Sequence, residues 1–186
     1  TKIDRSGIVH RLDRHTSGVI VLAKTQEAHT HLKEQFQNRT IEKTYVAFVY
    51  DHIKDDEGTI DRPIGRSKND FRKWTAQRGV RGEMREAITH YRVLERLETE
   101  EGEFTYLELE PETGRTHQLR VHLKAINHPF LCDALYAPNR PCLLGFERMA
   151  LHAKKIVFRS IERSEIEIEA TLPRDFKKTA HNYSAV

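Results

Sequence analysis

The sequence predicts an α+β domain with a mixed, mainly antiparallel sheet flanked by helices. Segments with strand character outnumber those with helix character, and the two do not alternate regularly along the chain. The length of 186 residues is close to that of one domain, and the chain holds no internal repeat or low-complexity segment. We therefore expect a single domain over residues 1–186.

The first part of the chain predicts two strands and a helix. Residues 19–23, VIVLA, form an uninterrupted apolar run that is typical of a strand buried on both faces. Residues 25–39 fit a surface helix, because Thr25 is a good N-cap. Its apolar face recurs at every fourth position: Ala28, Leu32 and Phe36. Residues 43–50, KTYVAFVY, are aromatic and β-branched, which favours a central strand.

The second part of the chain is expected to add most of the sheet. The predicted strands are residues 87–94, 104–109, 155–158 and 165–172. In the last of them, EIEIEATL, apolar and polar residues alternate, so one face is expected to be in water. A helix is predicted to begin with Thr116 as its N-cap and to end before Pro129.

Composition limits the cellular context. The charged fraction is 32% and the net charge +3, and no apolar run is long enough for a membrane span or a signal peptide. We therefore expect a cytoplasmic protein with no membrane contact. Cys132 and Cys142 are too few for a disulfide framework, so they are expected to be reduced thiols. Because the first residue is Thr, the chain is expected to be a piece of something longer.

Charge is distributed unevenly along the chain. Residues 62–85, here called the basic arm, hold eight Lys or Arg against only Asp70 and Glu83. Glycines mark this segment as a loop or hairpin rather than a helix. Residues 95–112, in contrast, hold eight Glu and a single Arg. One face is therefore expected to meet anions and another to avoid them.

The first candidate site is HRLD at residues 10–13, just before the first predicted strand. Cationic neighbours on both sides of Asp13 are expected to keep it ionised, which suits a nucleophile or a base. The alternative is a turn aspartate that bonds to local backbone and forms a surface salt bridge. Spacing alone favours this second interpretation.

The second candidate site is ETGRTHQLRVH at residues 112–122, where Gly114 makes a turn into a helix. Helix N-termini and arginines attract anions, so Arg115 is a candidate clamp for a carboxylate. An ordinary capped helix with solvated cations is the alternative, and His122 is expected to be a packing residue. A metal site is not predicted, because His117 and His122 are five apart and HExxH is absent. The phosphate loops GxxxxGK[ST] and GxGxxG are also absent.

Together these segments resemble the RluA-type family of RNA pseudouridine synthases. The matching segments, in order, are HRLDRHTSGVIVLAKT at 10–25, KTYVAFV at 43–49, PIGR at 63–66, AITHYRVLER at 87–96, ETGRTHQLRVHL at 112–123, HPFLCDALY at 128–136 and ALHAKKIVF at 150–158. The resemblance covers nearly the whole chain, and HRLD combined with GRTHQLR is highly specific.

The resemblance implies that a uridine within rRNA or tRNA is flipped out and isomerised to pseudouridine, with no cofactor and no metal. It makes Asp13 the catalytic carboxylate, Arg115 its partner, and Tyr45 the ring that stacks on the base and helps to remove the C5 proton. Other candidate RNA contacts are Arg11, which would fill the space left by the base, Leu151, His117 and Arg120. We expect a monomer.

The basic arm is interpreted as an RNA-gripping element, with a solvated loop anchored by a buried Trp as the alternative. Its candidate RNA contacts are Arg72, Lys73, Trp74 and Arg78, with Phe71 as a further aromatic that can stack on a base. Two other functions compete for the whole chain: a non-catalytic RNA-binding module and, less favoured, a metal-dependent nuclease.

Two features depart from the family pattern. Family members usually begin with an upstream strand and a Lys-Pro turn, often after a small RNA-binding domain, and this sequence starts too late to contain them. Cys132 stands where the family commonly has Gly before Asp133. We expect a tolerated change in packing at that position.

Overall fold

A computed structural model describes residues 3–183 and confirms the expected α+β class. The helices are η1 (Asp4–Gly7), α1 (Gln26–Gln37), α2 (Gln118–Ala125) and α3 (Arg174–Tyr183). The strands are β1 (Ser17–Gly18), β2 (Glu42–Tyr50), β3 (Glu57–Asp61), β4 (Ile64–Ser67), β5 (Trp74–Thr75), β6 (Val80–Arg85), β7 (Ile88–Thr99), β8 (Gly102–Pro111), β9 (Leu151–Arg159) and β10 (Glu165–Glu169).

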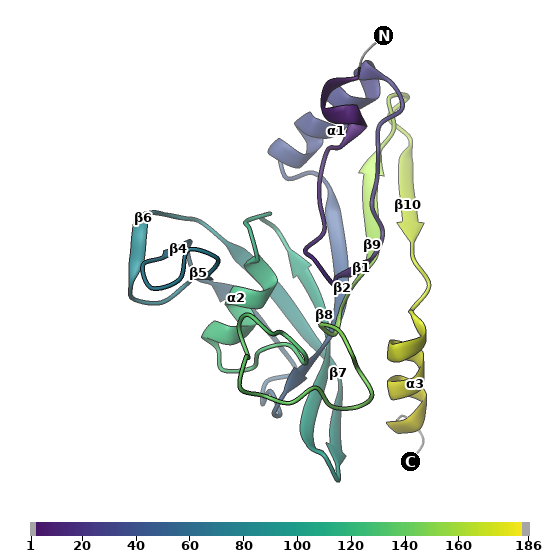
Figure 1. Ribbon diagram of the computed structural model, residues 1–186. Coiled ribbons are helices and arrows are strands. Elements are labelled where there is room, and N and C mark those ends of the chain that lie inside the picture. The colour runs from purple at the N-terminus through teal and green to yellow at the C-terminus, as the bar shows by residue number, and fades with distance from the viewer. Residues whose placement is uncertain (1–2, 184–186) are drawn as a thin grey trace.

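One mixed sheet forms the body of the protein, in the strand order β1-β9-β2-β8-β7-β3, and β10 also pairs with β9. Only the β1–β9 pairing is parallel among the described residues; the other pairings are antiparallel, as expected. The strands of the basic arm form a second sheet in the order β5-β4-β6, which projects to the left in Figure 1. The expected loop or hairpin character of this arm is confirmed.

The central strand β2 is buried on both faces because its alternate side chains enter two different cores. Even-numbered residues of β2, such as Phe48, pack with Leu131, Phe146 and Phe176 of α3. Odd-numbered residues, such as Val49, join the apolar side of α2. Residues 43–50 are therefore a central strand, as predicted, with a helix covering each face.

The apolar run 19–23 is not the doubly buried strand that the sequence predicts. Only Ser17 and Gly18 pair with β9, and Ile20 and Leu22 remain 49% and 55% exposed. The reason lies in β9, because β10 occupies the same edge from Lys155 onward and no partner is left for a longer β1. Gly18 allows this close approach: its φ is 119°, and a Cβ there would lie 2.1 Å from the Ala153 carbonyl oxygen.

Helix α1 agrees with the prediction, since the Thr25 side chain accepts a hydrogen bond from the Ala28 amide. The start of α2 does not, because its N-cap is His117 in the left-handed region (φ 55°) rather than Thr116. The Gln118 side chain replaces the expected cap and accepts a hydrogen bond from the Arg115 amide at 3.0 Å. Strand β10 is shorter than predicted, and its apolar face is poorly covered, because it lies at the sheet edge with Ile168 39% exposed.

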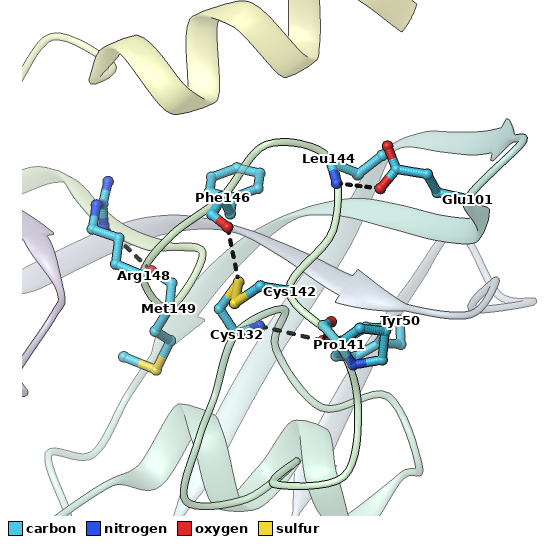
Figure 2. Close-up of a disulfide and its surroundings, with 9 residues drawn as sticks. All are labelled: Tyr50, Glu101, Cys132, Pro141, Cys142, Leu144, Phe146, Arg148 and Met149. Carbon is cyan, nitrogen blue, oxygen red and sulfur yellow. Dashed lines mark hydrogen bonds between the residues drawn. A yellow bond between two sulfur atoms is a disulfide. The ribbon is translucent and has the colours of Figure 1, made fainter.

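A disulfide joins Cys132 to Cys142 within the long loop that connects α2 to β9. Their Cα atoms are 4.8 Å apart, a spacing that suits such a bond, so the expectation of two reduced thiols is wrong. Figure 2 shows how Tyr50 braces this loop: its hydroxyl accepts from the Cys132 amide and donates to the Pro141 carbonyl. Cys132 has a φ of 59°, which explains why glycine suits this position.

A buried ion pair fixes the same loop to helix α2. The Arg120 guanidinium donates two hydrogen bonds to the Asp133 carboxylate, at 2.8 and 2.7 Å. Asp133 also accepts from the amides of Leu135 and Tyr136. Its side chain is 1% exposed and that of Arg120 10%, so this carboxylate and guanidinium depend on each other for charge compensation.

We expect Asp133→Asn to lower the free energy of unfolding by about 3 kcal/mol, because Arg120 loses a buried counterion. Denaturant unfolding monitored by circular dichroism measures the change. Asp70→Asn is the matched control, since Asp70 accepts a bidentate pair from Arg72, whose side chain is 65% exposed. This control should change stability little. Equal effects of the two variants would contradict a structural role for the buried pair.

Candidate active site

The main cavity has a volume of about 610 Å³ and lies where the HRLD loop meets the start of β2 and the turn before α2. Six of the residues predicted for the site line it: Arg11, Asp13, Tyr45, Arg115, His117 and Leu151. These residues come from segments far apart in the sequence. The fold therefore gathers most of the predicted site in one place, and Arg120 lies directly behind Asp13.

The Asp13 side chain is 22% exposed and faces a guanidinium, but not that of Arg115. Arg120 Nη1 donates to Asp13 Oδ2 at 3.4 Å. Arg115 instead donates from Nε to the Glu86 carbonyl at 2.9 Å. The predicted Arg115–Asp13 pair is thus corrected. Arg120 lies within α2, whereas Arg115 lies in the turn that precedes the helix, on the other side of the left-handed residue His117.

The HRLD loop is held by contacts at both ends. The Asp13 carbonyl accepts from the Thr16 amide at 3.0 Å, so Asp13 does occupy a turn, as one interpretation of the sequence required. His10 Nε2 accepts from the Val21 amide at 2.8 Å, and its ring stacks on Phe36. Burial, with a further contribution from Lys43, lowers the pKa of His10, which keeps this imidazole neutral. The turn aspartate and the cavity carboxylate are therefore the same group.

Tyr45 reaches the cavity from β2 and packs against the cluster that contains Leu151. Burial, with the nearby Asp13 carboxylate, raises the pKa of Tyr45 to about 12. The phenol is therefore protonated at neutral pH. Leu151 is 3% exposed and pairs with Ala47, so it forms part of the apolar wall behind the ring.

His117 and Tyr136 form the side of the site next to Arg120. His117 Nδ1 lies 3.0 Å from the Tyr136 hydroxyl, and burial lowers the pKa of His117 although Asp13 acts in the opposite direction. Arg120 lies over the Tyr136 ring at 4.9 Å from its centroid. Sequence analysis missed Tyr136 and Asp133 as supports, although both lie in the matched segment HPFLCDALY.

The candidate RNA contacts of the basic arm lie outside the cavity lining and differ in their surroundings. Arg72 makes two hydrogen bonds to Asp70, which lower the pKa of Asp70 to about 2, and Lys73 lies 3.9 Å from the same carboxylate. Trp74 is half-buried against the cluster of Ile64 and Tyr136, so it anchors the arm. Arg78 is exposed, and its side chain has no hydrogen bond or ion pair among residues 3–183.

Phe71 is 82% exposed in the connection between β4 and β5, which makes it the aromatic ring of the arm that is available to a ligand. In the described part of the chain, His, Cys, Asp and Glu do not gather into any group of three or more that could hold a metal ion. None of the helices described is both long and apolar enough to span a bilayer.

The comparisons with known proteins agree on one family. The family model described as RNA pseudouridylate synthase matches residues 1–125. The RNA pseudouridine synthase YlyB of Bacillus subtilis is 42% identical over 179 residues, which cover 96% of this chain and 56% of that protein. The ribosomal large subunit pseudouridine synthase D of Neisseria meningitidis is 40% identical over 94% of this chain and 47% of its own length.

Solved structures show the same relation. Human RNA pseudouridylate synthase domain containing 1 matches with a TM-score of 0.77 at 31% identity, over 89% of this chain and 68% of that chain. The human domain containing 4 protein matches with a TM-score of 0.74 at 30% identity, over 94% of this chain and 74% of that chain. The chain spans about half the length of the curated relatives that it matches. Its sequence and its fold both place it in the RNA pseudouridylate synthase family, to which the chain belongs.

Proposed function

We propose that this chain isomerises uridine in RNA to pseudouridine, with Asp13 as the catalytic carboxylate. The observation that carries the proposal is the position of Asp13, which lies in a cavity beside Tyr45 and is backed by the Arg120 guanidinium at 3.4 Å. A cavity of about 610 Å³ suits a single flipped nucleotide. Arg11 is exposed at the cavity lining, where it can fill the space that the base leaves.

The reaction needs a carboxylate that is ionised and free on one side. In the isomerisation the N1–C1′ bond breaks, the uracil turns, the C5–C1′ bond forms, and a proton leaves C5 while N1 gains one. Asp13 acts either as the nucleophile at the sugar or by assisting departure of the base, and both roles use the charged form. Arg120 stabilises that charge from behind, and the cavity side of Asp13 remains open.

Tyr45 supplies a neutral ring and hydroxyl to the base. Because the pKa of Tyr45 is about 12, the phenolate is rare near pH 7 and the phenol is not itself a ready base. If Tyr45 removes the C5 proton, the Tyr45 hydroxyl must first give up its own proton to another group. Asp13 is the nearby carboxylate, and its charge contributes to the raised pKa of Tyr45. The flat ring on an apolar wall is suited to stacking on uracil.

The basic arm supports RNA as the macromolecular substrate. Four of its cations are exposed and make no side-chain hydrogen bond, ion pair or ring contact among the described residues: Lys68, Arg78, Arg81 and Arg85. They are better suited to phosphates than Arg72 and Lys73, whose charge Asp70 partly neutralises. Phe71 is the exposed ring for base stacking, in place of Trp74.

The printed name of the Neisseria meningitidis relative refers to the large ribosomal subunit, which supports rRNA as the first RNA to test. All residues proposed for the reaction come from a single copy of the chain, which supports a monomer as the acting unit. Release of tritium from [5-³H]uridine-labelled RNA tests the proposed reaction directly. RNA binding without release would favour a non-catalytic module instead.

Asp13→Asn should abolish tritium release while RNA affinity and thermal stability are retained, because the change removes the charge and preserves the shape. Asp61→Asn, at an exposed carboxylate outside the cavity lining, is the matched control and should have full activity. Turnover by Asp13→Asn at a tenth of the wild-type rate or more would refute the catalytic assignment.

A matching lysine variant at each position distinguishes the roles of the two arginines of GRTHQLR, Arg115 and Arg120. Arg120→Lys loses the fork that joins Asp133 to Asp13, so kcat should fall about a hundredfold through misplacement of the carboxylate. Arg115→Lys should have a smaller effect, since a lysine still donates to the Glu86 carbonyl. Single-turnover rates at saturating enzyme measure both. A larger loss for Arg115→Lys would restore the pairing that the family resemblance implies.

Replacing Lys68, Arg78 and Arg81 by Gln should weaken RNA binding and reduce the slope of log Kd against log salt by about 0.7–0.9 for each lost contact. The control replaces three exposed cations, Arg163 in the turn between β9 and β10 and Lys177 and Lys178 in α3. These elements lie away from the arm in Figure 1, so the slope should be nearly unchanged. Filter binding at several salt concentrations provides the data. Identical slopes for the two triple variants would mean that RNA follows another path.

A further inference from the structure

Lys43 lines the cavity, and its ammonium group has no counterion among the described residues. It precedes Tyr45 by two residues on β2, so both side chains point to the same face of the sheet. Both also line the cavity. The Lys43 side chain is half-buried and makes no hydrogen bond or ion pair with the described residues.

The carboxylates of the cavity do not compensate this charge. Asp13 faces Arg120, and Glu112 lies 2.6 Å from His90 Nε2. His10, whose pKa Lys43 lowers, accepts the Val21 amide and remains neutral. Burial lowers the pKa of Lys43 itself to about 8. The fold therefore maintains a partly desolvated ammonium group that nothing in the described protein neutralises.

Such a group lowers stability unless an anion compensates it. The packing of β2 does not require it, because an uncharged side chain of similar length fills the same space. RNA carries one anionic group per nucleotide, its phosphate, and lysine binds phosphate as a point charge. The location next to Tyr45 places this charge within the space that a flipped nucleotide enters.

We propose that Lys43 binds a backbone phosphate next to the target uridine and so positions the flipped nucleotide over Asp13 and Tyr45. This inference rests on the proposed function. It assigns to Lys43 a role in positioning the substrate that is separate from the chemistry of Asp13. Its loss should therefore raise Kd and KM more than it lowers the rate of the bound complex.

Lys43→Met should raise the Kd for RNA about tenfold. It should also reduce the slope of log Kd against log salt by the amount expected for one lost phosphate contact, about 0.7–0.9. Lys43→Arg should retain most of the affinity. Thermal stability of Lys43→Met should equal or exceed that of the wild type, because an uncompensated charge is removed. Lys155→Met, which removes a lysine from the neighbouring strand β9 where it pairs with Glu167, is the matched control and should bind normally.

A neutral methylphosphonate linkage on either side of the target uridine identifies the phosphate. At one of the two positions it should weaken binding by the wild type about tenfold and have little effect on Lys43→Met. An equal loss for both proteins at every position would mean that Lys43 contacts no phosphate, and would overturn the inference. Unchanged RNA affinity of Lys43→Met would also overturn the inference. A loss of affinity that accompanies a fall in thermal stability, and that Lys43→Arg does not rescue, would overturn it as well.

The pH dependence provides a second measurement. Wild-type affinity should fall as the pH rises from about 7 to about 9, because Lys43 loses its charge, and Lys43→Arg should bind evenly over this range. Of the groups around it, His10 is neutral throughout this range and Tyr45, with a pKa of about 12, is also uncharged. Asp13 has its counterion in Arg120. Identical profiles for the wild type and Lys43→Arg would contradict the proposal.

Turnover is read separately from binding. Absence of tritium release by the wild type would refute the proposed function, whereas the Kd comparisons decide the role of Lys43 whether or not turnover occurs.

Discussion

The Arg120 guanidinium connects the parts of the molecule on which the site depends. Two of its hydrogen bonds fix the Asp133 carboxylate and thereby the long loop before β9. A third, weaker contact at 3.4 Å reaches Asp13 in the N-terminal loop. Because the strong bonds are made to Asp133, Arg120 is held rigidly and Asp13 is stabilised without being fully engaged. The catalytic role proposed for Asp13 requires this balance of charge stabilisation and access.

Local patterns predict those elements whose environment is itself local. Helix α1 with its Thr25 cap and the two-sided burial of β2 follow from spacing and residue type. The prediction of a buried strand at 19–23 is wrong because pairing of this segment depends on the edge of β9, about 130 residues later in the chain. Strand β10 occupies that edge. The predicted N-cap of α2 is wrong for a similar reason. The Gln118 side chain, which takes the place of that cap, is held by hydrogen bonds to Thr113 and to the β7 backbone. Such long-range competition leaves no periodic signal in the sequence.

The site shows the same division. The family resemblance identified Asp13, Tyr45 and the GRTHQLR segment, and the structure gathers these around one cavity. It assigned Arg115 as the partner of Asp13, whereas Arg120 makes that contact. The two arginines lie on either side of the left-handed residue His117, a backbone feature that the motif does not reveal. The disulfide also escaped prediction, because its two cysteines meet only when the loop before β9 folds back on itself. Lys43 was visible as part of KTY, but only its burial without a counterion distinguishes it from a surface lysine.

The short parallel pairing of β1 with β9 has a consequence for how the protein is made. Ser17 bonds to His152, 135 residues further along the chain, and this contact closes the loop that carries Asp13. A ribosome adds about 5–20 residues per second, so the N-terminal loop waits roughly ten seconds for its partner strand to be synthesised. Contacts of such long range also form slowly in refolding. The nascent chain can therefore complete α1 early, but the loop that carries Asp13 is closed only after β9 has been synthesised.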